Sequence, residues 1–145
     1  MRLPARRTSV VAAVALGLTL GGCASSGSSG APAAAGAVDG VRHLDVDGFA
    51  ALAAAPATVL LDVRTAEEFA SGHLQGARNL DFRAADFDTR LASLPKGSTY
   101  AVYCHSGNRS GQTLDRMSAT GFTHVADLSG GITAWTATGR PTTTG

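Results

Sequence analysis

A single cysteine lies where an apolar segment meets a helical pattern. Cys104 follows the apolar segment 99–103, and four residues separate it from Arg109. A cysteine in this place lies at the carboxyl end of a strand and the amino end of a helix, where open α/β folds place their active sites. Helix amino ends carry partial positive charge and free N–H groups that bind anions. Because a nearby arginine also favours the thiolate, we predict that Cys104 is a reactive thiolate in an anion-binding loop.

The loop after Cys104 supplies the candidate binding groups. Gly107 allows the backbone to fold tightly around the sulfur, so that successive amides converge on it. Arg109 is suited to hold an anionic donor through two parallel hydrogen bonds. Ser110 is placed to cap the helix and to donate its hydroxyl towards the sulfur. The candidate substrate-binding residues of the loop are His105, Ser106, Gly107, Asn108, Arg109 and Ser110.

Composition excludes several classes of function. The chain of 145 residues has 12 basic and 11 acidic residues, and three of the arginines lie in the first seven positions. The remaining basic residues are scattered singly, with Lys96 the only lysine, so no nucleic-acid surface is expected. Two cysteines cannot form a disulfide framework. His43 and His124 have no partner at metal-ligand spacing, so neither a metal nor a cofactor is expected.

The amino-terminal segment has the features of an export signal. Three arginines in 1–7 precede an apolar run at 10–20, and the small residues of 21–22 follow it. The run is shorter than the ~20 residues that span a bilayer. The segment 20–23, Leu-Gly-Gly-Cys, resembles the bacterial lipobox, in which the cysteine is lipidated and becomes the first residue. We therefore expect an exported protein anchored to the outer face of the cell membrane through lipid on Cys23; the alternative is an ordinary signal peptide with a chance cysteine.

These features divide the chain into four parts. Residues 1–22 are the predicted lipoprotein-type signal peptide, and 23–38 are the lipidated cysteine with a flexible Ser/Gly/Ala linker. The folded domain is predicted over 39–141, followed by a tail at 142–145. Lipid on Cys23 leaves Cys104 without a partner in the same chain. An unpaired cysteine in an oxidising compartment indicates a functional thiol.

Strand and helix patterns alternate through the domain. Apolar runs predict strands at 41–44, 58–63, 76–80, 99–103 and 122–128. Helical patterns lie at 47–55, from Thr65, at 86–94, from Ser110 and at 132–138, and Asp47 is the candidate cap of the first. Thr65 and Glu68 form a capping-box pattern at the start of the second helix. This alternation predicts an α/β fold with a mainly parallel sheet.

The chain resembles the rhodanese family of sulfurtransferase domains in three blocks that occur in family order. The blocks are Leu61–Arg64 with Glu67–Phe69 and Gly72–Ala77, then Val102–Ser110, then Leu128–Ile132 with Ala134, Trp135 and Gly139. The resemblance covers about 39–141. It implies a rhodanese-like fold, in which helices flank both faces of a central sheet of about five strands. It also brings Arg64 into the candidate site; an ion pair with Asp62 or Glu68 is the other reading of that arginine.

The resemblance implies an enzyme of the thiosulfate:cyanide sulfurtransferase type. Cys104 would take a sulfane sulfur from a small anionic donor such as thiosulfate, and a thiol or other thiophile, possibly a protein, would remove it from the persulfide. Related cell-cycle phosphatases have five residues between cysteine and arginine, whereas this loop has four, which favours a sulfur atom over phosphate. The alternatives are an extracytoplasmic sulfur or redox relay, or a binding module, with little activity on thiosulfate. A phosphatase or arsenate reductase is the reading that loop length disfavours.

Overall fold

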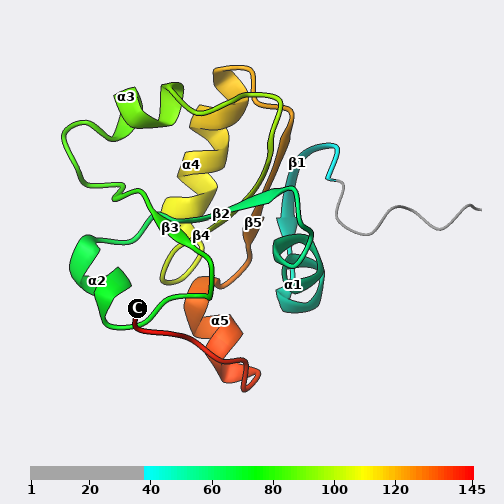
Figure 1. Ribbon diagram of the computed structural model, residues 1–145. Coiled ribbons are helices and arrows are strands. Elements are labelled where there is room, and N and C mark those ends of the chain that lie inside the picture. The colour runs from blue at the N-terminus through cyan, green and yellow to red at the C-terminus, as the bar shows by residue number, and fades with distance from the viewer. Residues whose placement is uncertain (1–37) are drawn as a thin grey trace, which may run out of the picture. The chain divides into compact units, whose positions relative to one another are not determined.

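Five parallel strands form the centre of the domain in the computed structural model, which describes residues 38–145 (Figure 1). The strands are β1 (Gly40–Leu44), β2 (Thr58–Asp62), β3 (Arg78–Asn79), β4 (Thr99–Tyr103) and β5 (His124–Leu128). Their order across the sheet is β1-β5-β4-β2-β3, and every neighbouring pair is parallel. The predicted parallel α/β fold is therefore confirmed. The predicted signal peptide and the lipidation site at Cys23 lie outside the described residues.

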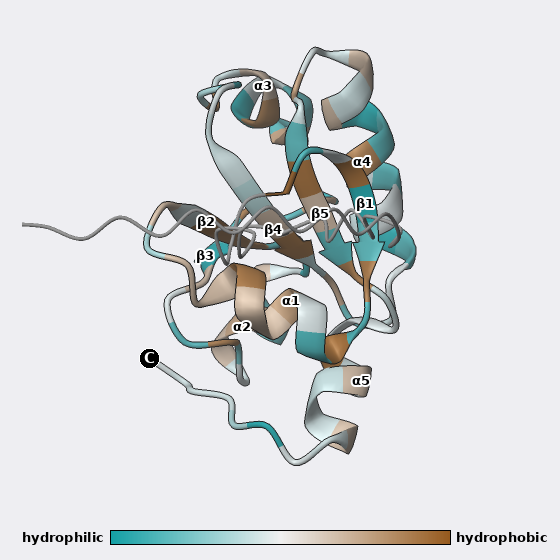
Figure 2. Cartoon of the chain, turned by 90° about the vertical axis from the view of Figure 1, so that its right-hand side faces the viewer, coloured by the Kyte–Doolittle hydropathy of each residue, from teal (hydrophilic) through white to brown (hydrophobic). Residues whose placement is uncertain are grey.

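Helices cover both faces of this sheet, as predicted. They are α1 (Val46–Ala53), α2 (Ala66–Ala70), α3 (Phe87–Ala92), α4 (Asn108–Ala119) and α5 (Gly131–Ala137). Figure 2 shows α3 and α4 above the sheet, with α1, α2 and α5 below it. Between residues 38 and 145, no helix is both long and apolar enough to cross a membrane.

The central strand β4 shows why an apolar run becomes a strand here. Tyr100 and Val102 pack into the core under α3 and α4, whereas Ala101 and Tyr103 pack into the core on the opposite face. Because side chains alternate along a strand and both faces are covered, the run is apolar throughout. Cys104 follows directly, at the carboxyl edge of the sheet.

Two helix starts differ from the predicted ones. The cap of α1 is Asp45 rather than Asp47, because the Asp45 side chain accepts a hydrogen bond from the amide of Gly48 at 2.8 Å. The predicted start of α4 at Ser110 is two residues late, since the helix begins at Asn108. The position before it is Gly107, whose φ of 95° lies in the left-handed region. The loop after Cys104 is therefore shorter than predicted, and the sulfur lies closer to the helix end.

Candidate active site

The sulfur of Cys104 is enclosed by its own loop. The side chain is 1% exposed, and the Gly107 amide donates a hydrogen bond to the sulfur over 3.1 Å. Five other amides of the loop have no protein acceptor within the described residues: those of His105, Ser106, Asn108, Arg109 and Ser110. The last three belong to the first turn of α4, where amides are unpaired within the helix. One amide is thus engaged with the sulfur, and five amides of the same loop and of the start of α4 remain free to bind a ligand.

The start of α5 holds this loop from its carbonyl side. The Cys104 carbonyl accepts from the amide of Ile132 at 2.8 Å, and the His105 carbonyl accepts from the Thr133 hydroxyl at 2.9 Å. Gly131 lies so close that a Cβ there would be 2.5 Å from the backbone of both loop residues. Because α5 binds the carbonyls of Cys104 and His105, these carbonyls point away from the side of the loop on which the amides are free. The turn at 130–131 therefore supports the loop. The sequence alone does not indicate this contact.

Arg109 is bound by a carboxylate of the protein itself. Its two terminal nitrogens donate to the two oxygens of Glu68, at 2.7 and 2.8 Å. The two parallel hydrogen bonds that we predicted for an anionic donor are made here to Glu68 of α2. The hydrogen bond from Glu68 raises the pKa of Arg109, and the guanidinium in turn lowers the pKa of Glu68 to about 2. This ion pair ties the cysteine loop to α2.

Glu68 also fixes its own helix, so one carboxylate has two tasks. Its Oε2 accepts from the amide of Thr65 at 3.0 Å, and the Thr65 hydroxyl accepts from the amide of Glu68 at 3.3 Å. The predicted capping box is therefore confirmed. Because the cap holds the glutamate in place, it also aims the carboxylate at Arg109.

Replacing Glu68 by glutamine is expected to destabilise the fold by about 1 kcal/mol at pH 7. The glutamine amide can still cap the helix, but it lacks the negative charge that pairs with Arg109. The native pKa of about 2 lies below the ordinary value of 4.5, so this stabilisation is present above pH 4.5. It is lost as the pH falls towards 2. Urea unfolding of both proteins across this range measures the difference. Asp115→Asn, at an exposed acid of α4 without an ion pair among the described residues, is the control. A difference that stays constant with pH would contradict the assignment.

Arg64 lies beside the site but is fully engaged in the fold. The side chain is buried, and its guanidinium donates to both oxygens of Asp62 and to the carbonyl of Gly72 at 2.6 Å. Burial disfavours the charged form and is the largest single effect, but the hydrogen bond and the charge of Asp62, together with Tyr103, outweigh it and raise the pKa of Arg64. Of the two readings of Arg64 from sequence, the structure shows the ion pair with Asp62.

The remaining loop side chains divide into exposed and buried groups. His105, Ser106 and Asn108 are exposed at the surface of the loop, where they can meet a donor or an acceptor. Ser110 is buried, and its hydroxyl lies 2.8 Å from Asp127 and 3.1 Å from the Gly107 carbonyl. The predictions that Ser110 caps the helix and points at the sulfur are therefore wrong. It is the third residue of α4, and that phase turns its side chain towards β5.

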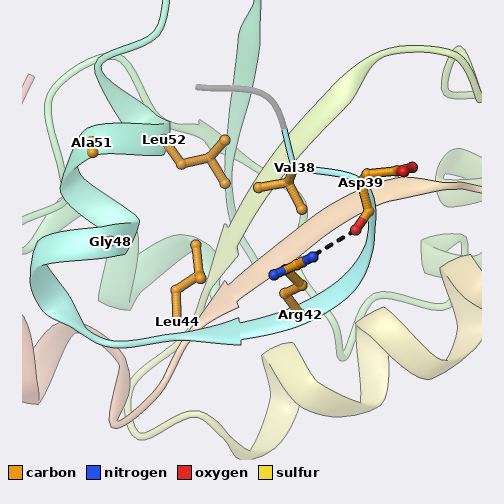
Figure 3. A pocket seen from close by; sticks show the side chains of 7 residues that line it. All are labelled: Val38, Asp39, Arg42, Leu44, Gly48, Ala51 and Leu52. Atoms are coloured by element: carbon orange, nitrogen blue, oxygen red, sulfur yellow. Dashed lines mark hydrogen bonds between the residues drawn. The ribbon is translucent and has the colours of Figure 1, made fainter. Parts of the chain in front are cut away.

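Cavities elsewhere offer less chemistry. A cavity of about 310 Å³ between β1 and α1 has an apolar lining that includes Leu44 and Leu52 (Figure 3). Its lining contains one acid and one base, Asp39 and Arg42, and no nucleophile. Between residues 38 and 145, no cluster of three metal-ligating side chains occurs. The chemistry of the described chain therefore centres on Cys104.

Fold and site together define a single-cysteine α/β domain whose thiol lies in an amide-lined loop. The chain belongs to the rhodanese-like domain family, whose sequence profile matches residues 45–138. This confirms the family and the fold inferred from the three sequence blocks.

Comparisons with individual proteins agree with this assignment. The chain is 37% identical over 90 residues to the uncharacterised protein slr1261 of Synechocystis. The match covers 59% of this chain but only 47% of that protein. The chain is 40% identical over 81 residues to thiosulfate sulfurtransferase GlpE of Pseudomonas putida, covering 55% and 71% of the two chains. A crystal structure of a rhodanese-related protein from Thermoplasma volcanium superimposes with a TM-score of 0.64 at 26% identity, covering 72% and 99%.

Proposed function

We propose that the protein is a sulfurtransferase that carries sulfur as a persulfide on Cys104. The thiolate attacks the outer sulfur of thiosulfate or a similar small anionic donor. The bond between the two donor sulfurs breaks, and sulfite leaves with the electron pair. A thiophile, such as cyanide in an assay or a thiol in the cell, then takes the outer sulfur and returns the thiolate. No cofactor enters this cycle.

The arrangement of donors around Cys104 carries the proposal. The Gly107 amide already binds the sulfur at 3.1 Å, and the free amides of the loop are available to a second sulfur atom. A persulfide is an anion, and amides at a helix amino end stabilise anions. The similarity to the thiosulfate sulfurtransferase of Pseudomonas putida supports this chemistry.

A relay between thiols is the second candidate, and the engaged arginines favour it. Arg109 and Arg64 are both neutralised by carboxylates, so neither presents a free charge to a small anion. In such a site a thiol-bound persulfide is a donor as suitable as thiosulfate. The two candidates share the Cys104 persulfide and differ in the donor.

Mass spectrometry of the full chain tests the proposal. After mixing with thiosulfate, the tryptic peptide 97–109, which holds Cys104 alone, is expected to gain about 32 Da, one sulfur atom. Cyanide should then remove the added mass and yield thiocyanate. A low-molecular-weight persulfide tested in parallel separates the candidates, because a relay loads from it and hardly from thiosulfate. A peptide that gains no mass from either donor would exclude both.

The same digest tests where the protein resides. We infer export and anchoring to the outer face of the cell membrane through lipid on Cys23, supported by the charged, apolar and small-residue pattern of 1–23. Protein isolated from its own membranes should then yield a lipid-modified peptide 23–42. An unmodified peptide that begins elsewhere would contradict the lipid anchor.

A further inference from the structure

Asp127 is a buried carboxylate that the proposed chemistry does not use. It lies on β5, is 2% exposed, and points to the face covered by α4. One oxygen contacts Nδ1 of His43 on the adjacent strand at 2.6 Å, and the other accepts from Ser110 at 2.8 Å. Its strand is otherwise buried and apolar from Val125 to Leu128. Since burying a carboxylate is costly, its place in an apolar strand needs a reason.

The order of these three groups excludes a nucleophilic serine. In a Ser–His–Asp triad the imidazole lies between the hydroxyl and the carboxylate and takes the proton of the hydroxyl. Here the carboxylate of Asp127 lies between Ser110 and His43. Ser110 therefore has no base of the triad type, and the network holds groups in place.

Ser110 connects Asp127 to the loop that binds the sulfur. The Ser110 hydroxyl has one proton and two oxygens near it, and Asp127 is closer than the Gly107 carbonyl, at 2.8 against 3.1 Å. The same Gly107 donates its amide to the sulfur of Cys104 and accepts from the amide of Gly111 at 3.0 Å. The anchored serine thus lies against the glycine that binds the sulfur.

We propose that Asp127 is a positioning residue that holds Ser110, and through it the first turn of α4, so that the Gly107 amide points at the sulfur of Cys104. The inference rests on the proposed function in one respect: the positioned amide serves the thiolate and its persulfide. Since a displacement of about 1 Å near a reacting centre costs up to about 10²-fold in rate, a loosened turn is expected to slow Cys104 measurably.

Asp127 can act on Cys104 through its negative charge and through its hydrogen bond to Ser110. These two effects change the reaction rate of Cys104 in opposite directions. A negative charge near the amino end of α4 competes with the thiolate for the same partial positive charge. If charge were the main effect, both Asp127→Asn and Asp127→Ala would speed the reaction of Cys104. If positioning is the main effect, the asparagine oxygen still accepts from Ser110 and only alanine slows the reaction.

The test compares Asp127→Asn, Asp127→Ala, Ser110→Ala and the Asp127→Ala/Ser110→Ala double variant in the full chain. The main readout is the rate of alkylation of Cys104 by iodoacetamide, followed on peptide 97–109 across pH, together with kcat for sulfur transfer. Thr113→Val is the control, because it removes a buried hydroxyl one turn further along α4 that bonds only a backbone carbonyl. Thermal melting selects a temperature at which all variants are folded.

Both alanine variants are expected to react about 10-fold more slowly, whereas Asp127→Asn and Thr113→Val stay within about 2-fold of the parent. The double variant should be no slower than either single one, since both remove the same connection. Equal effects of asparagine and alanine, an unchanged rate in Ser110→Ala, or fully additive losses would each overturn the inference. Should Asp127→Ala fail to fold, Ser110→Ala against Thr113→Val still decides. Alkylation that follows this pattern in a protein without sulfur transfer would refute the proposed function alone.

Discussion

Replacing Cys104 by serine is expected to reduce sulfur transfer to the rate of the uncatalysed reaction, a loss on the order of 10³-fold or more. A hydroxyl does not form the thiolate that attacks the donor, and an oxygen cannot hold the sulfur as a persulfide. Serine fits the site, since it is nearly the size of cysteine and can accept the Gly107 hydrogen bond made to the sulfur at 3.1 Å. The fold should therefore persist while turnover is lost. Thiocyanate formation from thiosulfate and cyanide measures the effect.

The second cysteine of the chain supplies the matched control. Cys23→Ser replaces the other cysteine, and this variant should retain the full rate and the persulfide on peptide 97–109. Turnover that survives in Cys104→Ser would show that another group attacks the donor. Loss of turnover together with a lowered melting temperature would point to damage of the fold, so melting curves accompany the kinetics.

The regular elements were the most predictable part of this domain. The strand 99–103 was predicted with its observed bounds, because an apolar run followed directly by the cysteine loop leaves little choice of where the strand begins and ends. The Thr65–Glu68 capping box was likewise predicted, since both partners lie within one turn of helix. Local patterns of this kind are complete in the sequence. They placed Cys104 at the end of a strand and before a helix, which is the main feature of the site.

The partners of the loop side chains could not be predicted in the same way. Glu68 and Arg109 lie 41 positions apart, and the glutamate already had a satisfactory local role in its cap. The direction of Ser110 depends on where α4 begins, and a shift of two residues turns its side chain from the sulfur to Asp127. Asp127 itself left one signal, a carboxylate within an apolar strand. Because a buried charge must be compensated, a carboxylate in such a strand indicates a polar partner on a neighbouring element.

The close approach of Gly131 to the cysteine loop is a second feature that only the folded chain shows. In the sequence, Gly130 and Gly131 belong to the third block that resembles the rhodanese family. In the structure a Cβ at 131 would lie 2.5 Å from the Cys104 carbonyl oxygen and from the His105 carbonyl group. All of these atoms are backbone, so no side-chain rotation relieves the overlap. The lack of a side chain at 131 is therefore a requirement of the loop that binds the sulfur.

Replacing Gly131 by alanine is accordingly expected to destabilise the fold by about 3 kcal/mol and to lower kcat by about 10²-fold. Two effects add: the φ of 61° is unfavourable for alanine by about 1 kcal/mol, and the overlap forces the Cys104 loop away from α5. Because the Ile132 amide holds the Cys104 carbonyl at 2.8 Å, moving the loop also weakens that bond. Urea unfolding and thiocyanate formation measure the two losses.

Gly139→Ala separates backbone strain from overlap. Gly139 also has a positive φ, 76°, but a Cβ there meets nothing within 4 Å. This variant should lose about 1 kcal/mol of stability, from the left-handed backbone alone, and keep the parent rate. If Gly131→Ala cost no more than Gly139→Ala and left kcat unchanged, the contact between α5 and the loop would not position Cys104. The larger loss at 131 instead measures how strongly the fold holds the backbone around the sulfur, which a local sequence pattern does not encode.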